Sequence, residues 1–234
     1  MPLTLEDLDF TQFSFELRFV HSYLLWDRAG RIWQETTRLL PKATVTNAAP
    51  NKIVMKDGPV ELNVEPDRVG IQLFDRELLK GIPAVAAEFT QMVSSILELS
   101  EFTRVGLRMI YRKVFPTKGG AAAEIMKFGF LRIPEDRYFG VAGLPLYPEI
   151  TFRKEEGSKG FSIRIKAEAI EYKLELPYFW HKVAKSVSEV HETVTFDLDS
   201  YVQGTILLSQ IAFEDWITQT LHVIRRDANG FLGG

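Results

Sequence analysis

The chain of 234 residues is 46% hydrophobic and 12% aromatic, which suffices for a continuous core and excludes a globally disordered protein. Its 28 basic and 31 acidic residues give a net charge of -3, which disfavours binding dominated by a nucleic-acid backbone. The absence of cysteine excludes disulfides, thiolate metal sites, iron–sulfur clusters and cysteine nucleophiles.

The opening segment MPLTLED is acidic and lacks the basic region and apolar run of a signal peptide. No apolar run in the chain approaches the roughly 18 residues needed to span a bilayer. We therefore expect a soluble, cytoplasmic protein that has no membrane partner.

The first part of the chain predicts a strand, a helix and then a meander of strands. Residues 12–20 alternate between apolar and polar side chains, and a helical spacing of apolar residues follows over 25–40. Short strands between turn residues are expected at 43–48, 52–56, 60–65 and 68–74. An amphipathic helix is expected over 76–99, with Asp75 as its N-cap.

Residues 104–115 predict the central strand of the fold. Apolar side chains at the odd positions 105 to 111 alternate with a row of arginines at every fourth residue. The arginines Arg104, Arg108 and Arg112 should therefore share the polar face of this strand.

The second part of the chain repeats this order of strands and then a helix. A short helix is expected at 121–128, followed by a long loop at 134–148. Strands are expected at 150–154, 161–167, 170–176 and 190–198. The apolar phase changes near Glu168, which predicts a bulge or tight turn there. A last helix is expected over 205–227, ended by Asn229-Gly230.

These patterns predict an α+β fold of antiparallel sheets with long amphipathic helices packed on one face. The similar order of elements in residues 1–115 and 116–234 suggests two pseudo-repeated halves. The alternative is one continuous domain.

Three short motifs resemble a sporadically distributed bacterial family of conserved hypothetical proteins, about 230–270 residues long. The motifs are Phe15-Glu16-Leu17-Arg18-Phe19, Arg104-Val105-Gly106-Leu107-Arg108, and Phe196-Asp197-Leu198-Asp199 before a terminal helix. The resemblance covers nearly the whole chain and implies a shared fold, but no established activity and no catalytic residues. The patchy distribution of the family implies a defence or mobile-element setting.

The arginine row suggests an anion-binding face, because guanidinium groups bind phosphate and carboxylate through paired hydrogen bonds. This hypothesis comprises Arg18, Arg104, Arg108 and Arg112. The alternative is a solvated sheet face whose arginines pair across strands with Glu16, Glu61 or Glu171.

A basic hairpin is the second candidate site. It comprises Arg153, Lys154, Lys159, Arg164 and Lys166. With Phe152 and Phe161 nearby, this combination is typical of single-stranded nucleic-acid binding. The alternative is an ordinary solvated hairpin, because neighbouring glutamates dilute the charge and both phenylalanines fit the inward phase.

No metal or cofactor motif is present. The chain lacks paired metal-binding histidines, the phosphate-loop and dinucleotide patterns and the nucleophile elbow, so we expect no metal and no cofactor. His191 shares the polar side of one strand with Asp197 and Asp199, which could support proton transfer or bind a hard metal. The alternative places these carboxylates at a strand end before a helix N-terminus.

An aromatic segment supplies the last candidate. Tyr178 and Trp180 suit a partner-binding anchor, since Tyr and Trp are enriched in interface hot spots. The alternative is a core plug beneath the terminal helix.

The leading functional hypothesis is a non-enzymatic binding or interaction module with a protein partner or self-association, for example as a homodimer. The first alternative is a small-ligand-binding protein or enzyme, with Arg108 and Arg112 in a pocket between sheet and helices and the 134–148 loop as its lid. Nucleic-acid binding is the second alternative, which the net charge disfavours.

Overall fold

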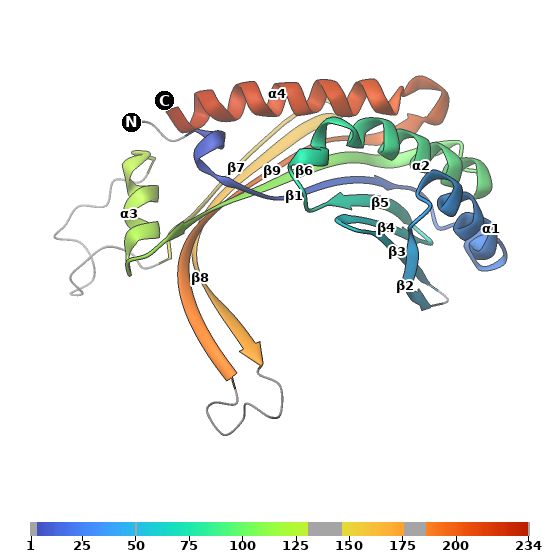
Figure 1. Ribbon diagram of the computed structural model, residues 1–234. Helices are drawn as coiled ribbons and strands as arrows, with labels where there is room; N and C mark the ends of the chain where they lie inside the picture. Colours follow the sequence, from blue (N-terminus) through green and yellow to red (C-terminus); the bar gives the residue numbers. More distant parts are fainter. Residues whose placement is uncertain (1–3, 50, 131–146, 176–185, 234) are drawn as a thin grey trace.

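The computed structural model describes residues 4–49, 51–130, 147–175 and 186–233 (Figure 1). The strands are β1 (Asp9–Arg18), β2 (Thr44–Ala49), β3 (Lys52–Asp57), β4 (Val60–Glu65), β5 (Arg68–Leu73), β6 (Glu101–Phe115), β7 (Glu149–Glu156), β8 (Lys159–Glu175) and β9 (Ser186–Leu207). The helices are α1 (Leu24–Leu39), α2 (Ile82–Ile96), α3 (Gly120–Lys127) and α4 (Phe213–Gly233). Short 3-10 turns cover Leu5–Asp7, Glu77–Lys80 and Leu208–Gln210.

All the described strands form one antiparallel sheet in the order β2-β3-β4-β5-β1-β6-β9-β8-β7. The α+β class with an antiparallel sheet is therefore confirmed. Helices α2 and α4 lie along one face of the sheet, and α1 packs beside α2 (Figure 1).

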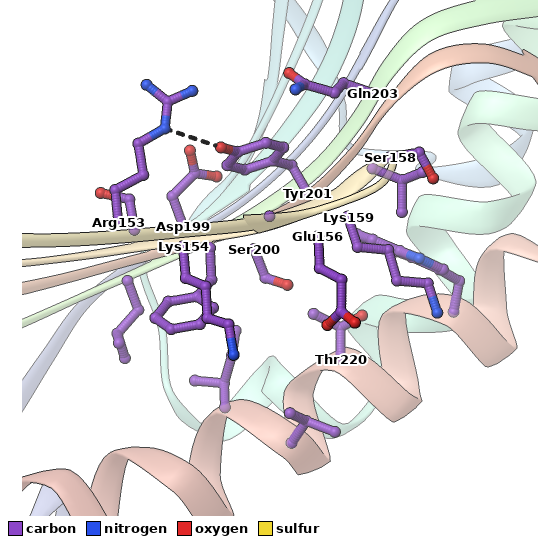
Figure 2. Close-up of a pocket in the computed structure, with 18 of the residues that line it drawn as sticks. Arg153, Lys154, Glu156, Ser158, Lys159, Asp199, Ser200, Tyr201, Gln203 and Thr220 are labelled. Atoms are coloured by element: carbon purple, nitrogen blue, oxygen red, sulfur yellow. Dashed lines mark hydrogen bonds between the residues drawn. The ribbon is translucent and has the colours of Figure 1, made fainter.

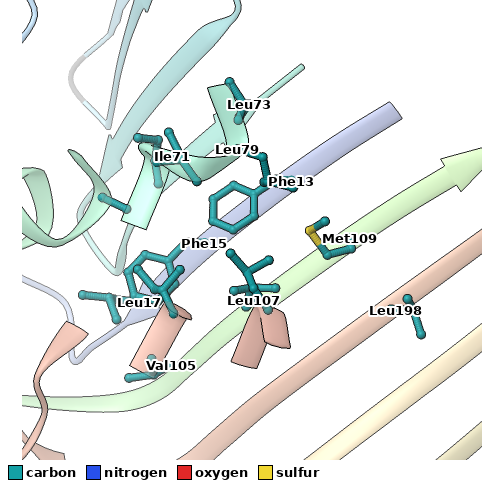
Figure 3. Close-up of a cluster of buried hydrophobic side chains, with 14 of the residues drawn as sticks. Phe13, Phe15, Leu17, Ile71, Leu73, Leu79, Val105, Leu107, Met109 and Leu198 are labelled. Carbon is teal, nitrogen blue, oxygen red and sulfur yellow. The ribbon is translucent and has the colours of Figure 1, made fainter. Parts of the chain in front are cut away.

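The alternation of apolar and polar residues explains which face of the sheet the helices cover. Phe13, Phe15 and Leu17 of β1 lie beside Val105 and Leu107 of β6 in the buried cluster of Figure 3, and all five are fully buried. The intervening polar residues face the other way, because successive side chains of a strand point to opposite faces. The helix-covered face is thus the apolar one, and the opposite open face is polar.

The predicted break near Glu168 is wrong. Strand β8 continues from Lys159 to Glu175 and stays in one register with β9 throughout. The apolar phase changes because the neighbours change: β7 pairs with β8 only as far as Lys166, and the rest of β8 runs on with β9 as a ribbon (Figure 1). Helix α3 contacts β8 and β9, and the pair Ala167↔Val194 is buried, so the change of phase falls where β8 loses β7 as its second neighbour.

The terminal helix begins later than predicted, at Phe213, because β9 continues to Leu207 and pairs there with Glu101. The predicted stop at Asn229-Gly230 is also wrong, since α4 continues to Gly233. The Asn229 side-chain oxygen instead accepts a hydrogen bond of 2.9 Å from the backbone N–H of Leu5.

The helix predicted over 76–99 is divided. A 3-10 turn at Glu77–Lys80 comes first, and α2 follows with Pro83 in its first turn. Asp75 does not cap α2; it accepts a hydrogen bond from the backbone N–H of Glu77 at 2.8 Å.

The sheet crosses the boundary between the two predicted halves without interruption. Strand β6 belongs to the first half and β9 to the second, yet they pair from Glu101↔Leu207 to Phe115↔Glu192. Buried residues of both halves join one hydrophobic cluster. The pseudo-repeat itself stays a prediction.

Candidate binding groove and the arginine face

The arginine row lies on the open face of the sheet, because the apolar residues between the arginines point to the helices. Arg18 of β1 stands directly opposite Arg104 of β6. Glu16 holds the two together: its Oε1 lies 2.6 Å from Nε of Arg18 and 3.4 Å from Nη1 of Arg104. The structure therefore joins Arg18 to the row, as the sequence predicted, but on the face opposite to the helices.

Two aspartates of β9 pair with the row. Nη2 of Arg104 donates to both carboxylate oxygens of Asp199, at 2.9 and 2.8 Å. Arg108 donates from Nε and Nη2 to Asp197 at 2.7 and 2.6 Å, a bidentate geometry, and this hydrogen bonding raises the pKa of Arg108. Burial raises the pKa of Asp199, although Arg104 acts against that shift.

The remaining arginine of the row makes a weaker contact, from Nε of Arg112 to Oγ1 of Thr195 at 3.4 Å. Of the acids expected as partners, Glu16 pairs with the row, whereas Glu61 pairs with Lys56 at 2.7 Å. This arrangement is a cross-strand salt-bridged face with Asp197 and Asp199 as the main partners. An external anion would compete with them, and anion binding by the row stays a prediction.

The five basic residues of the hairpin are divided between the two faces of the sheet. Arg153, Arg164 and Lys166 lie on the open face, and each pairs with a nearby glutamate: Glu155, Glu149 and Glu168, respectively. Lys154 and Lys159 lie on the helix side, because strand side chains alternate. The structure thus separates this set into two groups.

Tyr201 of β9 fastens the hairpin on the open face. Its hydroxyl donates to Oε1 of Glu155 at 2.6 Å. The same hydroxyl accepts from Nε of Arg153 at 3.2 Å (Figure 2). The hydrogen bond from Tyr201 lowers the pKa of Glu155 and in turn raises the pKa of Tyr201. The ring covers Gly160, where a Cβ would come within 2.5 Å of it, and Arg104 lies over the ring at 5.0 Å.

A polar cavity of about 490 Å³ lies beside this network on the open face. Arg108 and Arg164 line it together with Asp197, Asp199 and Glu149. Groups of both signs therefore line the cavity, so its charge is largely balanced from within.

A larger cavity of about 1070 Å³ lies on the other face, between α4 and strands β7, β8 and β9. We call it the α4 groove. Its walls are mainly apolar and include Phe152, Phe161, Ile163, Val202, Trp216 and Val223. At one end, the rings of Phe152 and Phe231 pack edge to face, with centroids 5.3 Å apart. The groove is a concave apolar surface, the usual form of a binding site.

Charged side chains mark the rim of the α4 groove. Lys154 and Glu156 of β7 and Lys159 of β8 extend from the hairpin toward α4, where Thr220 lies opposite (Figure 2). Within the described residues, these three side chains take part in no ion pair. The rim can therefore offer charges of both signs to a bound partner.

The α4 groove was not among the sites predicted from the sequence. Phe152 and Phe161 fit the inward phase, as predicted, but both line the groove rather than the core. A signal was present in the last helix, where Val223 adjoins Ile224 and widens the apolar stripe. An apolar stripe wider than the face that a helix packs against the core suggests that the helix makes a second apolar contact.

The histidine–carboxylate hypothesis does not match the contacts found. Asp197 and Asp199 are engaged by arginines in the middle of β9, rather than lying at a helix N-terminus. His191 Nε2 lies 3.1 Å from Oε1 of Glu189 instead. Among the described residues, no group of three or more histidines and acids is arranged to hold a metal ion.

Two predicted features, the aromatic anchor and the loop proposed as a lid, fall wholly or mostly on residues that the structure does not describe. Tyr178 and Trp180 lie outside the described residues, as does most of the 134–148 loop. In addition, the arginines lie on the face opposite to the helices, so they do not line the space between sheet and helices.

Comparison with known proteins adds no identity: no protein-family model matches the chain, and no curated protein matches it. Within residues 4–49, 51–130, 147–175 and 186–233, no helix is both long enough and apolar enough to cross a membrane.

Proposed function

We propose that this protein is a non-enzymatic binding module that contacts another protein through the α4 groove. The supporting observation is the groove itself, an apolar cavity of about 1070 Å³ on the helix-covered face of the sheet. The proposal includes the bacterial defence or mobile-element setting that the family resemblance implies.

The exposed apolar side chains of the groove favour a partner with an apolar contact surface. Phe161 and Val223, from opposite walls, are 40% and 43% exposed. Covering apolar surface contributes about 25 cal/mol for each Å² removed from water. Contiguous apolar patches with a polar rim are typical of interaction sites, whereas scattered exposed apolar residues are ordinary.

The charge distribution favours a protein partner over a nucleic acid. The open-face arginines already pair with Glu16, Asp197 and Asp199. At the groove rim, Lys154 and Lys159 stand beside Glu156, so the rim carries both signs. A phosphate backbone requires clustered positive charge, whereas protein interfaces combine an apolar centre with a mixed polar rim.

Photo-crosslinking in the source cells tests this proposal. Val223 is replaced by benzoylphenylalanine, and Thr218, an exposed residue of the same helix that is not part of the groove wall, is replaced in a control. We expect a discrete protein adduct at Val223 that is absent at Thr218. The adduct should disappear when Phe161→Asp places an unpaired charge in the groove.

The absence of an adduct at Val223, or equal adducts at both positions, would contradict the proposal. An adduct between two copies of this chain would mean that the groove serves self-association.

A further inference from the structure

The edge of the sheet next to the α4 groove points to how a partner binds. Strand β7 is the last strand in the sheet order and pairs with β8 on one side only. Its other side offers backbone N–H and C=O groups, and in the described part of the chain no strand pairs with them. An edge of this kind is a template for another strand.

The groove and this edge form one continuous surface. Phe152, Lys154 and Glu156 of β7 itself line the α4 groove, and Lys154 points toward α4 in Figure 2. A strand added beside β7 would turn every second side chain to the same face. Those side chains would lie against the rows Phe152↔Ile163 and Lys154↔Phe161 and so enter the apolar groove.

The opposite edge of the sheet offers no such surface. Every residue of β2 is exposed, including Val45 at 41%, and β2 lines neither of the cavities described above. An edge alone gives main-chain hydrogen bonds, whereas specificity requires pockets for alternate side chains. Of the two edge strands, β2 and β7, only β7 lies beside such a pocket.

We infer that the β7 edge and the α4 groove together receive an extended segment of a partner protein as an additional strand. The inference rests on the proposed function and specifies its binding mode. The groove-lining part of β7 runs from Phe152 to Glu156, which corresponds to roughly 16 Å and a segment of about five residues. The segment carries an apolar residue beside Phe152 and, on the same side, an acidic residue beside Lys154.

Selection of peptides on the full chain tests this inference. The probe is a phage-displayed library of random twelve-residue peptides. We expect enriched peptides with apolar residues at alternate positions. Val223→Asp should weaken their binding at least tenfold, whereas Val20→Asp, at a 70% exposed position outside the groove, should not. Circular dichroism and thermal unfolding of both variants confirm that they are folded.

Backbone methylation of the best peptide then distinguishes strand addition from other modes. In a strand added at an edge, alternate N–H groups face the neighbouring strand. Methylation of the peptide nitrogens should therefore weaken binding at every second position only. Lys154→Glu should also weaken binding, and exchange of the peptide's acidic residue for lysine should restore it.

The outcomes separate the inference from the proposal on which it rests. Binding that needs Val223 but shows no alternation on methylation would overturn strand addition and leave the groove as the protein-binding site. Failure to enrich any peptide, or binding unaffected by Val223→Asp, would count against both. A homodimer in light scattering that Val223→Asp converts to monomer would assign the edge to a second copy and overturn the inference.

Discussion

One row of residues across the helix-covered face contrasts the two ends of the sheet. The cross-strand pairs run Leu62↔Ile71, Ile71↔Phe15, Phe15↔Leu107, Leu107↔Ser200, Ser200↔Phe161 and Phe161↔Lys154. The first four of these residues are fully buried, whereas Phe161 is 40% exposed and Lys154 is exposed. The strands pair in the same antiparallel way along the whole row. The difference is whether a helix packs over the side chains.

The covering differs because the helices are placed differently at the two ends. Phe15 packs on Phe213 and Trp216 of α4 at centroid distances of 6.0 and 5.9 Å. Toward β7, the same helix leaves the α4 groove between itself and the sheet. Strand alternation therefore specifies which side chains turn to the helices, but not whether a helix covers them. Inward apolar side chains that no helix covers are available for contact with a partner protein.

The largest expected effect on stability comes from a substitution at the helix-covered end of the row, which we call the sealed end; the end at the α4 groove is the groove end. Phe15→Ala should lower the free energy of unfolding by about 4 kcal/mol, because it removes a fully buried ring and leaves a cavity. Phe161→Ala should cost less than about 1 kcal/mol, because this ring is partly in water already. Denaturation in urea measures both. Equal losses would mean that the groove end is as much core as the sealed end.

The groove end is fastened from the open face by Tyr201, and Gly160→Ala tests that contact. The new Cβ would approach the ring to 2.5 Å, so the ring must leave its hydrogen bonds to Arg153 and Glu155. We expect a loss of about 2 kcal/mol. Gly30→Ala is the control: its Cβ meets nothing within 4 Å in α1, and it should stabilise by about 0.5–1 kcal/mol.

A smaller effect is expected from the arginine row next to the groove end. Arg104→Met leaves Asp199 without its cation and should destabilise the protein by about 1.5 kcal/mol. Arg18→Met, whose side chain is 47% exposed, should cost at most about 0.5 kcal/mol. Thermal unfolding with and without added phosphate measures both variants. Stabilisation of the wild type by phosphate that Arg104→Met abolishes would support the anion-binding hypothesis for the row.

The smallest effects concern pH and have opposite signs on the two carboxylates compared. Burial acts to raise the pKa of Glu168, but hydrogen bonds from Lys166 and Thr195 outweigh it and the pKa is lowered. Glu168 therefore stabilises the fold above its ordinary pKa, and this contribution is lost as pH falls through the lowered value. For Asp199, whose pKa is raised by burial, the contribution is present below the ordinary pKa and is lost as pH rises through the raised value.

Substitution at these two positions should therefore change the acid limb of the stability curve in opposite directions. Glu168→Gln should make the free energy of unfolding fall less on acidification from neutral pH to below pH 4, and Asp199→Asn should make it fall more steeply. Urea denaturation at a series of pH values provides the measurement. If the slope of unfolding free energy against pH changed in the same direction for both variants, the pKa values of Glu168 and Asp199 would not be shifted in opposite directions.

Strand positions could be predicted from the sequence because alternation is a local signal. The meander at residues 44–73 and the central strand β6 follow their predicted spans within one to three residues. The break predicted near Glu168 failed, since the phase of β8 changes with its neighbours and not with its backbone. The predicted start of α4 was wrong for a related reason: Ile206 and Leu207 pair with Phe102 and Glu101 of β6, a contact distant in sequence.

The sites were less predictable than the fold. The alternation predicted that the arginines share a face, but not that Asp197 and Asp199 would pair with Arg108 and Arg104, since these ion pairs depend on strand order and register. The α4 groove depends on how a helix crosses a sheet, which no local pattern encodes. The five basic residues of the hairpin were predicted as one site, although the adjacent positions of Arg153 and Lys154 in a strand place these two side chains on opposite faces.

The pairing of β6 with β9 also has a consequence for biosynthesis. Arg104 and its partner Asp199 are 95 residues apart, so β6 leaves the ribosome long before the strand that will cover its second edge. At about 5–20 residues per second, this delay lasts roughly 5 to 20 seconds. During that time β6 presents an open edge next to Arg104, Arg108 and Arg112, and charges at an edge oppose pairing with other nascent chains. We therefore expect the arginines to disfavour pairing between nascent chains until β9 has been synthesised.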